Sequence, residues 1–207
     1  MRFNLKEGIR KLGPTGFPFE KYIGSIFSEM GYKVKLNLIL RGKCCAYEID
    51  FLAEKDDLIY VGECKYRHIA GEKIGSEIAL ENYARFLDLK NGNYFKKNKR
   101  IKSIIVTNTK FTSKAKKYSS CVGVDLLGWR YPSGGGLEKI IEERKLYPIT
   151  ILPSFKKELV DIFSSKRKML ARDALNIERM IPFIKSNLLR KQLQKIKKEA
   201  EVLLRKS

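Results

Sequence analysis

Two neighbouring β-rich runs constrain this chain most, because their spacing decides which charged side chains meet. Residues 46–54 and 58–66 are rich in strand-forming residues, and a polar Lys-Asp-Asp segment at 55–57 separates them. This pattern predicts an antiparallel hairpin with a short turn. A turn of even length places Asp50 opposite Glu63 on one face of the sheet. Two carboxylates about 5 Å apart in such a pair are destabilising unless another charge compensates them.

A lysine joins these carboxylates. The strand period of two places Lys65 on the same face as Glu63, and the same turn places Glu48 opposite Lys65. Ile59 and Val61 share the Glu63 face, and the other face of this strand is also apolar, so the strand is predicted to be buried on both sides. Charged groups there are costly unless they are paired or bind a metal.

The two carboxylates suit a magnesium ion, which proteins commonly hold with one or two carboxylates and substrate phosphate. The pattern therefore indicates a metal-dependent phosphodiesterase with Mg²⁺ (or Mn²⁺) as its cofactor. Two other interpretations stay open at this point. Glu48 and Lys65 could form an ordinary cross-strand salt bridge. A turn of odd length would shift the pairing by one residue and separate the carboxylates across the two faces.

Charge is distributed unevenly along the 207 residues. Residues 1–95 carry 15 basic and 13 acidic side chains, whereas residues 96–207 carry 28 basic and 10 acidic ones. This asymmetry indicates a polyanionic partner, with nucleic acid ahead of an anionic membrane surface. The alternative is a solvated lysine-rich surface that binds nothing. The side chains expected to contact DNA backbone phosphates are Lys96, Lys97, Lys99, Arg100, Lys110 and Lys114.

Several classes of protein and site are not expected. No apolar run reaches the ~18 residues of a membrane-spanning helix, and the N-terminus lacks the hydrophobic core of a signal peptide. The 4 cysteines show no Cys-x-x-Cys spacing and His68 is the only histidine, which argues against zinc. The chain is therefore expected to be cytoplasmic and reduced, without membrane contact.

The rest of the chain alternates between helix and strand patterns until about residue 152. A helix is expected from Thr15 to Met30, ended by Gly31, with Phe19, Ile23 and Phe27 on its apolar side. This alternation predicts an α/β sheet domain at residues 1–152. Only helical patterns follow, which predicts a basic helical domain at residues 153–207. The further elements expected are strands at 32–40, 104–106 and 122–127, and helices at 76–89, 111–118 and 137–145.

Asp50, Glu63 and Lys65, preceded by the helical Glu20, together resemble the PD-(D/E)xK nuclease superfamily. More closely, the chain resembles Mrr-type restriction endonuclease domains over roughly residues 13–150. The motifs that carry the resemblance are GPTGFPFE at 13–20, GYKV at 31–34, EID at 48–50, ECK at 63–65, TNTKFT at 107–112, LLGWRYP at 126–132 and LYPIT at 146–150.

The resemblance implies a restriction-endonuclease-like core, with a mixed central sheet flanked by helices and a C-terminal helical appendage. It makes Asp50 and Glu63 the metal ligands, Lys65 the catalytic lysine and Glu20 the supporting carboxylate of a DNA endonuclease in restriction or defence. It leaves open a homodimer. The alternative is a catalytically silent nucleic-acid-binding protein that retains the nuclease fold.

The chain departs from its relatives in two places. Some relatives carry an ATP-cone domain before the nuclease, and only a dozen residues precede Gly13 here, so no nucleotide binding is expected. Relatives also tend to have a histidine close behind the lysine, whereas two residues separate Lys65 from His68. An exposed loop position is therefore expected for His68. The basic helical tail faintly resembles a helix-hairpin-helix module but lacks the hairpin glycine.

Overall fold

The structure is a computed structural model that describes every residue except 1–2, 14, 70, 97, 186 and 207. The chain forms two compact units: the sheet unit, residues 26–139, and the helical unit, residues 1–25 together with 140–207. These junctions differ from the expected boundary at residue 152. Hydrogen bonds explain the difference, because Tyr22 donates to the carbonyl of Leu146 (2.8 Å) and Thr150 to that of Gly8 (2.6 Å). The N-terminal segment therefore packs with residues that precede the expected boundary.

The sheet unit is built on a mixed five-stranded sheet in the order β1-β2-β3-β5-β7. The first three strands are antiparallel, and β3, β5 and β7 run parallel. The strands β4 and β6 form a separate parallel pair. This architecture confirms the expected α/β class. The strands are β1 (Lys33–Arg41), β2 (Ala46–Lys55), β3 (Leu58–Lys65), β4 (Lys73–Ile74), β5 (Arg100–Thr107), β6 (Lys110–Phe111) and β7 (Asp125–Leu127).

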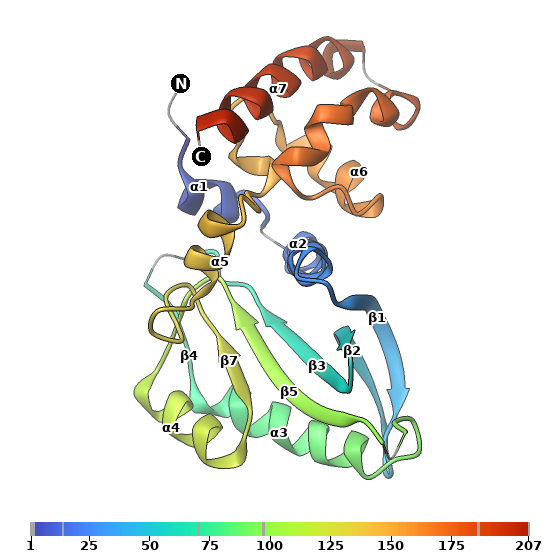
Figure 1. The fold of residues 1–207 in the computed structure, drawn as a ribbon, viewed down its shortest axis with the longest axis vertical. Helices are drawn as coiled ribbons and strands as arrows, with labels where there is room; N and C mark the ends of the chain where they lie inside the picture. The colour runs from blue at the N-terminus through green and yellow to red at the C-terminus, as the bar shows by residue number, and fades with distance from the viewer. Residues whose placement is uncertain (1–2, 14, 70, 97, 186, 207) are drawn as a thin grey trace. The chain divides into compact units, whose positions relative to one another are not determined.

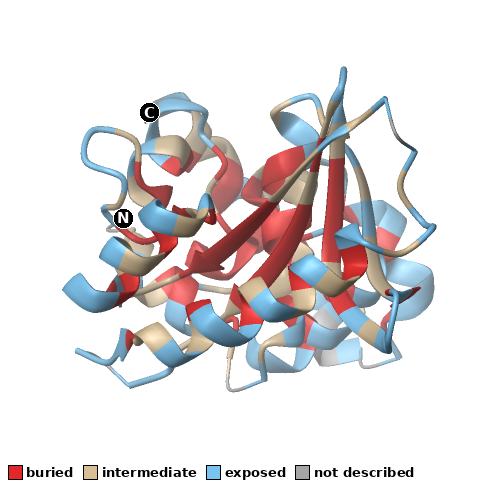
Figure 2. Ribbon diagram, turned by 90° about the horizontal axis from the view of Figure 1, so that it is seen from below, coloured by how far each residue is buried: buried red, intermediate tan, exposed pale blue. Residues whose placement is uncertain are grey.

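Helices cover both faces of this sheet. Figure 1 shows α3 (Ser76–Lys90) and α4 (Ser113–Val122) side by side across one face. On that face Phe86 and Leu89 of α3 pack in one buried cluster with residues of β1, β2 and β3. On the other face the Phe27 ring of α2 (Phe17–Glu29) lies 5.0 Å from that of Phe51. The central strands are accordingly buried (Figure 2).

The predicted hairpin register is confirmed. Phe51 pairs with Gly62 and Lys55 with Leu58, so the turn is the two residues Asp56 and Asp57. Asp56 has a left-handed φ of 54°, a conformation that aspartate tolerates better than most residues. The even turn length that the carboxylate argument required is therefore present.

The direct pairing of Asp50 with Glu63 is wrong, as is that of Glu48 with Lys65. The β2–β3 ladder ends at Phe51 and Gly62, one pair before the carboxylates. On the other side of β2, the β1 ladder is interrupted at Asn37, which has a left-handed φ of 51°. At Asp50 the ladder with β3 has therefore ended, and the ladder with β1 has a gap between its Leu36 and Leu38 pairs.

Several element boundaries differ from the expected ones. The helix expected at 111–118 begins at Ser113, because residues 110–111 pair as β6 and Thr112 caps the helix by accepting from the Ala115 amide (3.1 Å). The strand β5 is longer than expected and β7 is shorter. On α3, Leu87 is exposed, whereas Leu89 is buried. Gly31 confirms its expected role, because its φ of 88° ends α2.

The helical unit confirms the helical character expected after residue 153. Its core joins the N-terminal helix to the tail, and Leu193, Ile196, Ala200 and Leu203 of the last helix are buried as expected. Within the described part of the chain, none of the helices has the length and apolar character that crossing a bilayer requires. The remaining helices are α1 (Leu5–Arg10), α5 (Leu137–Glu143), η1 (Ile149–Ile151), η2 (Lys157–Leu159), α6 (Val160–Ser165), η3 (Ala171–Phe183) and α7 (Asn187–Lys206).

The last pair of the hairpin ladder predicts a packing defect. A methyl group added at Gly62 would lie 2.1 Å from the buried Phe51 ring, which is held against Phe27 and cannot move freely. We expect Gly62→Ala to lower the free energy of unfolding by about 1–3 kcal/mol, measured by urea denaturation. Gly135→Ala is the control, because its nearest neighbour would lie 3.8 Å away. Equal stability of the two variants would contradict this packing.

Candidate active site

The sheet unit contains a pocket of about 620 Å³ where β2, β3 and α3 meet. Four carboxylates and one guanidinium line it, so its chemistry is dominated by charge. All three elements contribute, which means that the site depends on the sheet and on the helix that covers it. The lining residues are Ala46, Tyr47, Glu48, Asp50, Glu63, Glu81, Ala84 and Arg85.

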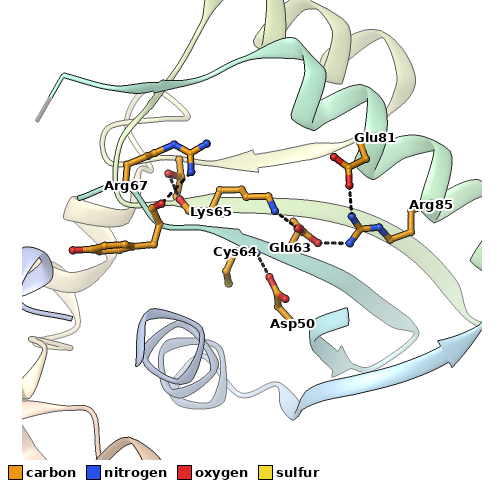
Figure 3. A network of polar contacts seen from close by, with 9 residues as sticks. Asp50, Glu63, Cys64, Lys65, Arg67, Glu81 and Arg85 are labelled. Carbon is orange, nitrogen blue, oxygen red and sulfur yellow. Dashed lines mark hydrogen bonds and ion pairs between the residues drawn. The ribbon is translucent and has the colours of Figure 1, made fainter. Parts of the chain in front are cut away.

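The Glu63 carboxylate is the buried centre of this site. Only 5% of Glu63 is exposed, and both of its oxygens are paired. Lys65 Nζ lies 2.6 Å from Oε1 and Arg85 Nη1 lies 2.7 Å from Oε2 (Figure 3). The ion pair confirms that Glu63 and Lys65 share one face of β3. A carboxylate this deeply buried is tolerated because two cations compensate it.

Arg85 reaches Glu63 because α3 is fixed in rotation against the sheet. Asn82, on the same helix, accepts a hydrogen bond from Ser103 of β5 (2.5 Å), and both side chains are buried. Glu81, one turn before Arg85, holds the second guanidinium nitrogen at 2.9 Å. The helix therefore presents a pre-oriented guanidinium to the carboxylate from the side opposite Lys65.

Asp50 occupies the space that opens where β2 leaves β3. Its Oδ2 accepts a hydrogen bond from the backbone amide of Cys64 (2.7 Å), so the carboxylate is held against β3 without being a ladder partner (Figure 3). Asp50 and Glu63 thus line the same pocket, as the hairpin argument required, although by a different route. Cys64 itself is buried, in agreement with its expected role as a small core residue.

The chemistry of this donor set fits a divalent metal. Asp50 and Glu63 offer hard oxygen ligands from adjacent strands, and Mg²⁺ commonly takes one or two carboxylates with water and phosphate. Among the described residues no group of three or more His, Cys, Asp or Glu could hold a metal ion. A metal would therefore depend on these two carboxylates, and at Glu63 it would compete with Lys65 and Arg85.

Tyr47 at the edge of the pocket is held in its protonated form. Burial, followed by the hydrogen bond and negative charge of Asp88, raises the pKa of Tyr47 to about 12. Asp88 also accepts from the backbone amides of Cys44 (2.9 Å) and Cys45 (3.1 Å), which ties the start of β2 to α3. Tyr47 is therefore suited to donate a hydrogen bond at neutral pH rather than to accept a proton.

The remaining site residues expected from the sequence have different environments. Glu20 lies in the first turn of α2, in the helical unit, so its supporting role stays a prediction. His68 is exposed, as expected. Arg85, Glu81 and Glu48 also line the pocket but were not predicted as site residues. No local pattern pointed to Arg85, because its position depends on how α3 packs against the sheet.

The basic side chains expected to contact DNA differ in their exposure and in their ion pairs. Lys96, Lys110 and Lys114 are exposed, and Lys97 lies outside the described residues. Lys99 pairs with Glu54 at 2.7 Å, and Arg100 lies 3.5 Å from Asp57. The charges of Lys99 and Arg100 are therefore partly compensated within the protein.

The environment of Glu63 predicts unequal effects of its neighbours on stability. Arg85→Gln removes one of two cations from a buried carboxylate, so we expect a loss of roughly 1–3 kcal/mol in the free energy of unfolding in EDTA. Glu81→Gln removes a partner that is 64% exposed, so its effect should stay below about 1 kcal/mol. Urea denaturation measures both. Equal losses for the two variants would show that Arg85 does not stabilise Glu63.

The chain is similar to known proteins in sequence and in fold. A family model described as a restriction endonuclease, Mrr_cat, matches residues 12–128. An uncharacterized protein of Archaeoglobus fulgidus is 39% identical over 151 residues, which cover 73% of this chain and 82% of that protein.

A solved structure shows the same fold. The crystal structure of AF1548, a protein of unknown function, matches with a TM-score of 0.80 and 34% identity over 93% of this chain and 100% of that one. The MspJI restriction endonuclease bound to a 27-mer oligonucleotide, at a TM-score of 0.41 and 11% identity, is too distant to bear on function. Because the family model matches more than half of the 207 residues, the chain belongs to the Mrr_cat restriction endonuclease family.

Proposed function

We propose that this protein is a metal-dependent endodeoxyribonuclease, with Mg²⁺ or Mn²⁺ as cofactor, that hydrolyses DNA phosphodiester bonds in restriction or defence. The observation that supports this most is that Asp50 and Glu63 line one pocket at the end of the hairpin ladder, with Lys65 paired to Glu63. Membership of a restriction endonuclease family supports the same reaction class.

The charge of each of these residues indicates its role in the reaction. Asp50 and Glu63 would hold the metal, which when bound would polarise a phosphoryl oxygen and lower the pKa of a water. Lys65 pairs with Glu63 and would orient the attacking water or neutralise developing negative charge. Arg85 lines the same pocket as the two carboxylates and would bind a phosphate oxygen of the substrate.

DNA is the proposed partner, bound mainly through its backbone. Lys73 and Lys110 are exposed and pair directly opposite each other in the small β4–β6 ladder. Like charges in that position are destabilising, which favours an anion as their natural partner. Lys96 and Lys114 add further exposed positive charge. Contacts of this kind position a duplex without recognising its sequence.

A second function is favoured by one specific observation. Both oxygens of Glu63 are already occupied by Lys65 and Arg85, which is an arrangement that a silent nucleic-acid-binding protein could keep for stability alone. The two functions differ in a simple way, because the silent protein would bind DNA without breaking it.

Cleavage and binding should separate in Lys65→Ala. We expect wild type to nick supercoiled plasmid with Mg²⁺ and not with EDTA, and the variant to lose at least a hundredfold in rate, as is typical when a catalytic electrostatic group is removed. DNA affinity in EDTA should change little, because one charge among many contributes little to it. Lys90→Ala is the matched control, because it removes one exposed lysine charge at the end of α3. A wild-type protein that binds plasmid but leaves it supercoiled in Mg²⁺ would support the silent function instead.

A further inference from the structure

Lys65 is the last residue of β3 and lies where the pairing of this strand ends. The β2–β3 ladder ends at Gly62, three residues before Lys65. The β3–β5 ladder continues to the pair of Lys65 with Thr107 and ends there. Strand ends open more easily than strand centres, because fewer hydrogen bonds hold them. The lysine with a proposed role in the reaction therefore lies where the ladders constrain β3 least.

Side chains at the end of β5 continue this pairing beyond Lys65. The Asn108 carboxamide accepts a hydrogen bond from the Arg67 amide (2.8 Å) and donates one to the Arg67 carbonyl (2.7 Å). It thus bonds both backbone groups of Arg67, as the backbone of a neighbouring strand does in a ladder. Thr107, which is fully buried, donates its hydroxyl to the carbonyl of Lys65 itself (2.6 Å). These three hydrogen bonds hold the backbone at Lys65 and two residues beyond it.

The place of the Lys65 ammonium group depends on this backbone. Nζ lies 2.6 Å from Oε1 of Glu63, and the lysine side chain is 28% exposed (Figure 3). Because lysine has a flexible four-carbon stem, only its backbone and its ion pair locate the charge. The ion pair weakens if Glu63 binds a metal ion, whereas the bonds from Thr107 and Asn108 do not involve Glu63. These bonds therefore hold Lys65 in the state in which the reaction takes place.

The segment that carries Asn108 is itself fixed by other loops. The Thr109 hydroxyl donates to the carbonyl of Glu72, and the Thr109 carbonyl accepts from the Trp129 amide (2.8 Å). Neither contact uses a group that bonds β3 or the residues after it. A supporting residue orients a catalytic group well only when it is held in place itself. Asn108 meets this condition.

We propose that Thr107 and Asn108 are positioning residues for Lys65 in phosphodiester hydrolysis. The effect on catalysis rests on the proposed nuclease function, whereas the positioning can be measured without cleavage. The alternative is that the two side chains only stabilise the fold. The two roles differ because a misplaced group slows the chemical step without weakening DNA binding, and a shift of about 1 Å can cost a hundredfold in rate.

The first measurement is the rate at which acetic anhydride acetylates Lys65 in EDTA, determined by peptide mass spectrometry. Lys99 is the internal reference, because its side chain is similarly exposed (25%) and pairs with Glu54 at 2.7 Å. We expect Asn108→Ala to raise the ratio of Lys65 to Lys99 acetylation by about threefold or more. Thr107→Val should also raise it, and valine favours strands, so this variant keeps the test open if Asn108→Ala folds poorly. An unchanged ratio in both variants would overturn the inference.

The second measurement is plasmid nicking in Mg²⁺ at saturating protein, with DNA affinity measured in EDTA. Asn108→Ala should lower the nicking rate by about tenfold or more and leave the affinity nearly unchanged. Thr109→Val is the matched control, because it removes a hydroxyl from the same segment but keeps the bonds to Lys65 and Arg67. It should change neither the nicking rate nor the acetylation ratio appreciably.

Equal effects of Thr109→Val and Asn108→Ala would overturn the inference in favour of a general loss of stability in this segment. Parallel losses of nicking rate and DNA affinity in Asn108→Ala would also overturn it. If wild type does not nick plasmid in Mg²⁺, the proposed nuclease function fails, and the acetylation ratio alone then decides whether Thr107 and Asn108 position Lys65.

Discussion

The buried carboxylate of Glu63 is the interaction on which the rest of the site depends. Burying a charge is strongly unfavourable, and here Lys65 and Arg85 compensate it from opposite sides. Arg85 can do so only because α3 is fixed to β5 through Asn82 and Ser103. The contacts that compensate the buried charge and fix α3 therefore also hold β3, β5 and α3 together beside the pocket. A divalent ion bound at Glu63 would compensate the carboxylate charge in place of Lys65 and Arg85.

The end of the hairpin ladder creates the space for this pocket. While β2 and β3 are paired, their side chains pack under α3 or against Phe27. Beyond Phe51 and Gly62 the strands separate, and Asp50 enters the gap and is held by the Cys64 amide. The left-handed Asn37 on β1 accompanies this distortion on the other side of β2. A regular sheet would have opposed the two carboxylates directly, with no room for a substrate.

The part of this site that depends on local sequence could be predicted, and the part that depends on tertiary packing could not. The hairpin register followed from a two-residue turn and strand alternation, and the shared face of Glu63 and Lys65 followed from a period of two. The end of the β2–β3 ladder before Asp50, and the gap in the β1–β2 ladder beside it, involve three strands at once. Arg85 belongs to a helix whose rotation is set by a buried hydrogen bond to β5, which no local pattern reveals. The compact units divide at positions other than residue 152 for a similar reason, because the N-terminal helices pack with residues far away in the chain.

The most direct test of the central role of the two carboxylates is thermal melting of wild type and Asp50→Asn, each in EDTA and in millimolar Mg²⁺. In EDTA the two should melt at similar temperatures, because an asparagine oxygen can still accept the Cys64 amide hydrogen bond. A ligand that binds only the native state stabilises it by RT ln(1 + [L]/Kd), about 2.7 kcal/mol at a hundredfold excess over Kd. Mg²⁺ should therefore raise the melting temperature of wild type and leave Asp50→Asn nearly unchanged. An equal rise in both proteins, or none in wild type, would contradict a metal site at Asp50 and Glu63.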